Sequence, residues 1–282
     1  MNRRWIVTGG LLFVCLAAFG QVPGAEVEQA RGVLRDGLEA KDWTVRVQAI
    51  QAAGLIGPND KLRVRLEQFL SDGNVNVRVA AVKTLTDLKS TASIPALEMS
   101  MREDKAPEVS FAAAKALYAL KDAAGRDWLI QVYEGKEKGA SSALESQKMK
   151  FMGNFHSLES TGMFVVSSGL GYVPVPGVGE GFSAVTGLLS DPDLSPRAAS
   201  LLLVSREKDP QTTVLLKEGL KDKDWSVRAS AAQAIAFTAR VSLRDALVPL
   251  FADGKEKVKF RAAGAYLHLA LLDGGSSTAA TP

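Results

Sequence analysis

The chain has 282 residues, of which 46% are apolar and 23% are charged, which is the composition of a soluble globular protein rather than a disordered or membrane protein. Its 34 basic and 31 acidic residues are interspersed and form no basic stripe of the kind that binds nucleic acid. We therefore expect a protein that binds neither DNA nor RNA.

The first twenty residues have the pattern of a secretory signal peptide. Arg3 and Arg4 precede an uncharged run that ends at Gly20 and is shorter than the roughly 20 residues of a membrane-spanning helix. Ala18 and Gly20 are small, as signal peptidase requires, so we expect cleavage before Gln21. The sequence predicts export to the periplasm or beyond, with a retained membrane anchor as the alternative.

A pattern with a period near 32 residues begins in the segment DWTVRVQAIQAAG and recurs in NVNVRVAAVKTL and DWSVRASAAQAI. Each copy has one slot that is usually arginine, and its occupants are Arg46, Arg78, Ser110, Arg197, Arg228 and Arg261. The positions one before, three after and seven after the slot fall on one helical stripe. The middle position is small in every copy: Ala49, Ala81, Ala113, Ser200, Ala231 and Gly264. Small residues there predict helices that approach closely.

Helix-capping signals support the same register. The residues four before the slot that can accept hydrogen bonds from a free helix end are Asp42, Asn74, Asp193 and Asp224. A second amphipathic segment precedes most of these turns, and no strand-like alternation competes with it. The sequence therefore predicts an all-α fold of repeated helical hairpins.

These columns resemble the HEAT repeat, specifically the short HEAT-like repeats of phycobilisome lyases and many bacterial proteins. The proline-bearing first helices around Pro95 and Pro249 carry the resemblance together with the turn-Asp, Val-Arg, Ala, Leu pattern, over about 26–138 and 191–272. The resemblance implies a right-handed α-solenoid of about six to seven hairpins, used mainly as a scaffold.

The arginine column has two interpretations, because it could grip an acidic partner or could bond the turns of its own and the next repeat. We expect the second, since each repeat contacts only its neighbours and must tie its turns together. In the last hairpin, His268 falls in the position seven after the slot. We expect it to be a polar cap on the end of the array.

The repeat register breaks between Lys138 and Asp191, where about 23 residues are inserted. We expect a leader at 1–20, repeats at 21–138, a degenerate repeat at 139–190 with an apolar hairpin at about 161–189, repeats at 191–272 and a disordered tail at 273–282. The hairpin could fill the solenoid groove, bind a protein or touch a membrane, the last being least favoured. Its predicted contact residues are Phe164, Val165, Val166, Tyr172, Val173 and Phe182.

The residues that usually carry chemistry are sparse. The only histidines, His156 and His268, are far apart in sequence, and the only cysteine, Cys15, lies in the leader. No phosphate-binding loop is present. We therefore expect no catalytic residue, metal or cofactor, and another protein as the partner. A membrane-associating factor, or a HEAT-like lyase or repair enzyme, is the alternative.

Overall fold

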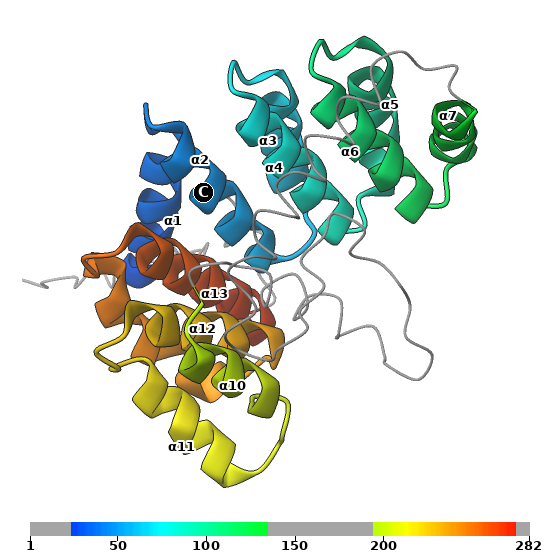
Figure 1. The fold of residues 1–282 in the computed structure, drawn as a ribbon. Coiled ribbons are helices and arrows are strands. Elements are labelled where there is room, and N and C mark those ends of the chain that lie inside the picture. Colours follow the sequence, from blue (N-terminus) through cyan, green and yellow to red (C-terminus); the bar gives the residue numbers. More distant parts are fainter. Residues whose placement is uncertain (1–23, 135–193, 275–282) are drawn as a thin grey trace, which may run out of the picture.

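The computed structural model describes residues 24–134, the N-terminal block, and 194–274, the C-terminal block, and no strand occurs in either range (Figure 1). The predicted all-α repeat fold is confirmed. The elements of the N-terminal block are α1 (Ala25–Leu38), α2 (Trp43–Ala53), η1 (Gly54–Ile56), α3 (Asp60–Gln68), η2 (Phe69–Ser71), α4 (Val75–Asp87), η3 (Thr91–Ser93), α5 (Ile94–Glu103), α6 (Pro107–Ala119) and α7 (Ala123–Tyr133). Those of the C-terminal block are α10 (Pro196–Val204), α11 (Pro210–Gly219), α12 (Trp225–Phe237), η4 (Val241–Ala252) and α13 (Glu256–Gly274).

The second helix of a hairpin begins where a capping side chain was predicted. Asp42, Asn74 and Asp224 each accept a hydrogen bond from the backbone N–H two residues later, at 2.8–2.9 Å. In α10, however, the cap is Ser195, whose hydroxyl accepts from the N–H of Ala198 at 3.3 Å. Because Pro196 follows it and favours the first helical position, α10 begins two residues later than the pattern predicts.

After α2, α4, α6 and α12, one residue has a positive φ. After α4, α6 and α12, the N–H that follows this residue bonds a carbonyl five residues back, which closes the helix, whereas after α2 the following residue is Pro58, which has no N–H. Glycine holds this position once, at Gly57 with φ 95°. Elsewhere it is held by Lys89, Lys121 and Ala239 with φ of 50–67°, a conformation that is strained for residues with a Cβ atom.

The hairpins stack in an order that differs from their order in the sequence. The last helix, α13, packs against α1 and α2, as Figure 1 shows in red and blue. The second helices therefore form one row in the order α10, α12, α13, α2, α4, α6. We call the contact of α13 with α1 and α2 the seam. The expectation that α13 ends the array is wrong.

A single apolar core runs through both blocks and across the seam, and it includes Leu34, Ile50 and Leu267, none of them solvent-accessible. The predicted small residues Ala49, Ala81, Ala113 and Ala231 are also fully buried. Ser200 is exposed instead, because α10 starts two residues late and Leu202, two residues further on, takes the fully buried position. That assignment is wrong by the same two residues as its cap.

The predicted slot is also wrong in α13. Asp72, Asp104 and Asp222 stand six residues before the slots in α4, α6 and α12, and the corresponding acid before α13 is Asp253. Six residues after Asp253 is Lys259, with the buried Val258 before it and the buried Ala262 three after it. Lys259 therefore occupies the slot, and Arg261, Gly264 and His268 lie two residues out of register.

The predictions made for the leader at 1–20, for the whole segment at 139–190 and for the tail from 275 on fall outside the described residues. The disordered tail was predicted from 273, but α13 continues to Gly274.

Candidate functional site

The arginine column ties successive hairpins together. Arg46 donates from Nε and Nη2 to the carboxylate of Asp72 in the next hairpin, at 3.1 and 3.0 Å. Its Nη1 donates to the carbonyl of Ala40 in its own turn, at 2.7 Å. One guanidinium therefore joins two turns through charge-assisted bonds.

The same arrangement recurs along both blocks. Arg78 pairs with Asp104 at 2.7 and 2.9 Å, and Arg228 pairs with Asp253 at 2.7 and 3.0 Å. Burial raises the pKa of Asp253, but the hydrogen bonds from Arg228 and a backbone N–H outweigh it, so that the pKa lies below its ordinary value. The structural interpretation is confirmed for Arg46, Arg78 and Arg228, since these guanidinium groups are already bonded within the array.

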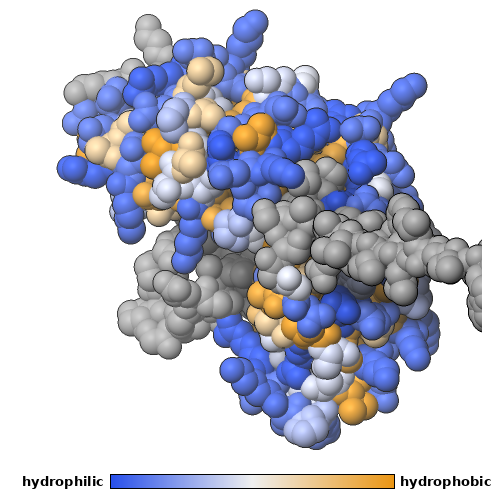
Figure 2. All heavy atoms as spheres, turned by 180° about the vertical axis from the view of Figure 1, so that it is seen from behind, coloured by the Kyte–Doolittle hydropathy of each residue, from blue (hydrophilic) through white to orange (hydrophobic). Residues whose placement is uncertain are grey.

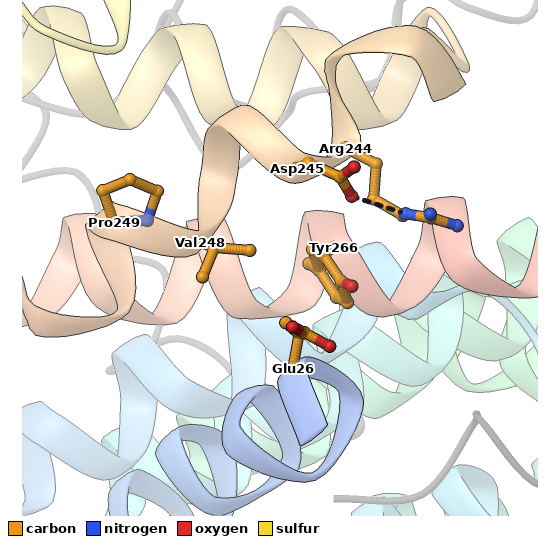
Figure 3. A pocket seen from close by; sticks show the side chains of 6 residues that line it. All are labelled: Glu26, Arg244, Asp245, Val248, Pro249 and Tyr266. Atoms are coloured by element: carbon orange, nitrogen blue, oxygen red, sulfur yellow. Dashed lines mark hydrogen bonds and ion pairs between the residues drawn. The ribbon is translucent and has the colours of Figure 1, made fainter. Parts of the chain in front are cut away.

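An open pocket lies where the seam meets η4 (Figure 3). It has a volume of about 550 Å³ and is lined by Glu26 of α1, by Arg244, Asp245, Val248 and Pro249 of η4, and by Tyr266 of α13. Pro249 has no N–H to donate, and η4 is a 3₁₀ helix where the other hairpins have an α-helix.

The arginine of this pocket, Arg244, is bonded to two carboxylates. Arg244 donates to Asp245 at 3.2 Å and to Asp273 at 2.5 Å, and lies 5.7 Å from the centre of the Tyr266 ring. Burial lowers the pKa of Arg244, but the two carboxylates outweigh it and raise the pKa. Burial raises the pKa of Tyr266, which Arg244 opposes and Glu26 supports. The Tyr266 phenol therefore stays protonated at neutral pH. Among the six lining residues, no nucleophilic side chain is hydrogen-bonded to a base that could activate it.

Of the two histidines, His268 is described. Its Nδ1 lies 3.1 Å from the carbonyl oxygen of Ile56, to which it donates across the seam. His268 therefore joins two blocks and does not cap an end. Within residues 24–134 and 194–274, no three histidine, cysteine or acidic side chains are grouped to hold a metal.

Exposed apolar side chains offer a different kind of site. Figure 2 shows apolar patches on both blocks within a mostly hydrophilic surface. At the C-terminal ends of α10 and α12, which pack together, Leu203, Val204 and Phe237 are 50%, 42% and 43% exposed. We call these three residues the α10–α12 patch.

Sequence reasoning did not find this patch, because Val204 falls in the column seven after the slot, where Leu85, Leu117 and Ile235 are fully buried. The predicted contact residues Phe164, Val165, Val166, Tyr172, Val173 and Phe182 lie outside the described residues. None of the described helices combines the length and the apolar character needed to cross a bilayer.

Comparison with known families agrees with the packing. A family model described as HEAT repeats matches residues 62–146, and a second one, described as HEAT repeat, matches residues 215–241. A search of curated proteins found no match. One match lies in each half of the stacked array, where hairpins are joined by the arginine–aspartate pairs. The chain is therefore a HEAT-like repeat protein.

Proposed function

We propose that the protein is a non-enzymatic scaffold of the bacterial cell envelope that binds another protein. The observation that carries the proposal is the α10–α12 patch. Three large apolar side chains on two adjacent helices gain from burial against a partner, at roughly 25 cal/mol for each Å² of apolar surface removed from water. Arg46, Arg78 and Arg228 are bonded within the array, so the arginine column is not the surface that we propose for the partner.

The pocket at the seam supports the non-enzymatic part of the proposal. Arg244 is bonded to two carboxylates, and Tyr266 keeps its proton. Such groups can hold structure together but offer no activated nucleophile. The envelope location rests on the leader pattern before Gln21.

The experiment compares two double variants of the tagged full-length chain in cross-linking pull-downs from the native envelope. In the first, Leu203→Ser and Phe237→Ser make the α10–α12 patch polar. In the control, Val64→Ser and Met99→Ser change side chains that are 45% and 60% exposed on α3 and α5. All four side chains are substantially exposed, so both variants should melt close to the wild-type chain.

We expect the control to capture the same partner as the wild-type chain and the patch variant to lose it. Equal capture by both variants would remove the patch from the binding surface. Intact mass spectrometry of the exported chain checks the location, since a retained leader would contradict it.

A further inference from the structure

We infer that the seam is a protein–protein interface in its own right, so that the N-terminal and C-terminal blocks recognise each other without needing a continuous chain between them. Within each block, neighbouring hairpins are also neighbours in sequence. At the seam they are not, because α13 ends one block and α1 begins the other. The partner that fits the α1–α2 face is therefore the α13 hairpin of the C-terminal block.

The seam is a close, shape-specific contact. A Cβ atom on Gly264 would lie 2.3 Å from the carbonyl oxygen of Ala52, and one on Gly37 would lie 2.5 Å from the Phe260 ring. Neither distance is possible for real atoms, so glycine lets the two backbones meet on one side and lets an aromatic ring pack on the other. Phe260 is 3% exposed as a result.

A polar contact fixes the register of this packing. His268 donates to the carbonyl oxygen of Ile56 at 3.1 Å, directly before Gly57, whose φ of 95° favours glycine. A Cβ atom on Gly57 would lie 3.6 Å from the imidazole Nδ1. His268 thus binds one specific turn of the N-terminal block.

The seam lacks the pair that joins other hairpins. Where α2, α4 and α12 have an arginine in the slot, α13 has Lys259, which pairs with Glu256 of its own helix at 2.8 Å. Where the next turn carries an aspartate in other hairpins, the turn before α2 has Ala40. Apolar burial and close backbone packing hold the seam instead, as they do in interfaces between separate proteins.

The chain between the blocks is long enough to allow this arrangement. It runs from 135 to 193, 59 residues, and connects α7 at one end of the row to α10 at the other. Five interhelical steps of 8–10 Å separate α10 from α6, about 40–50 Å in total. Fully extended, 59 residues reach at most about 3.3–3.6 Å each, which is several times this separation. The connection is therefore long enough for pairing within one chain.

The test cuts the folded protein. A protease site is inserted between Lys138 and Gly139 of the full-length chain, and the cut product is examined by size-exclusion chromatography and by titration of one labelled fragment with the other. We expect the fragments to stay together at about 1 μM and to exchange with added unlabelled fragment.

Two glycines provide matched variants. Gly264→Ala places a methyl group against the Ala52 carbonyl, and Gly32→Ala places one in open space on the outer side of α1. We expect Gly264→Ala to raise the dissociation constant of the cut fragments about 10- to 100-fold and Gly32→Ala to change it less than about threefold. If uncut Gly264→Ala does not fold, His268→Ala replaces it, with an expected rise of about fivefold. Wild-type fragments that separate at this concentration would overturn the inference, and so would equal constants for the seam variant and the Gly32 control.

Discussion

Enlarging the buried small residue in α4 should be among the most destabilising single changes in the chain. Ala81 has no exposed surface and lies on the helix that packs between α2 and α6. Ala81→Leu adds three carbon atoms to this interface, and overpacking of this kind destabilises by about 1–3 kcal/mol. For folded domains of roughly 150–250 residues, that corresponds to a fall in melting temperature of roughly 2–12 °C.

Ser200 provides the control, because the sequence pattern places it in the same column while the structure exposes it. Ser200→Leu should change stability by less than about 0.5 kcal/mol. Circular dichroism melts with urea titrations at 25 °C measure both variants. Equal midpoints for Ala81→Leu and the wild-type chain would refute the close-packing argument, and a large loss in Ser200→Leu would refute the late start of α10.

Four further predictions use the same measurements or a pull-down. Arg78→Ala should destabilise the protein by about 2–3 kcal/mol, since it leaves the Asp104 carboxylate, which is 8% exposed, without its arginine. A loss of unfolding free energy below about 1 kcal/mol in urea titration would contradict this. Ala239→Gly should raise stability by about 0.5–1 kcal/mol, because glycine adopts φ near 50° without strain, and no gain would count against that reason. Arg197 donates to Asp222 at 2.6 and 2.9 Å, and this hydrogen bonding lowers the pKa of Asp222 below its ordinary value of 3.8. The stability that the pair contributes is complete above pH 3.8 and is lost as pH falls through the lower folded pKa, so stability should fall in acid titrations below about pH 4. Changing Phe164 and Phe182 to serine should abolish partner capture with little change in melting if those residues form a binding surface, and an early melt would contradict that.

The sequence predicted the local structure well because its signals are local. Asp42 accepts from an N–H two residues later, and Arg46 bonds the turn carbonyl of Ala40 six residues earlier, so both residues could be placed from a single copy of the repeat. The predicted register is wrong in α10, because the fixed φ of Pro196 sets the start of the helix. It is also wrong in α13, because Arg261 has the expected residue type but Lys259 has the expected spacing from Asp253.

The seam could not be predicted in the same way. Every hairpin presents similar apolar faces, and periodicity shows which faces are buried without showing which hairpin covers them. Gly37 and Gly264 were visible in the sequence, but a glycine in a helix has several explanations until its neighbour is known. The pairing of His268 with Ile56 depends on residues 212 positions apart.

The turn aspartates each accept two kinds of bond, and this affects how the array unfolds. Asp72, Asp104 and Asp222 each accept a bond from the following helix start as well as from the arginine of the preceding hairpin. Melting one helix start thus loosens an ion pair in the neighbouring layer, which couples the opening of hairpins inside a block. These couplings end at the seam, because the turn before α2 has Ala40 at the position where other turns have an aspartate. Native-state hydrogen exchange should therefore divide the described part of the molecule into two cooperative units, and their border falls where α1 and α2 meet α13.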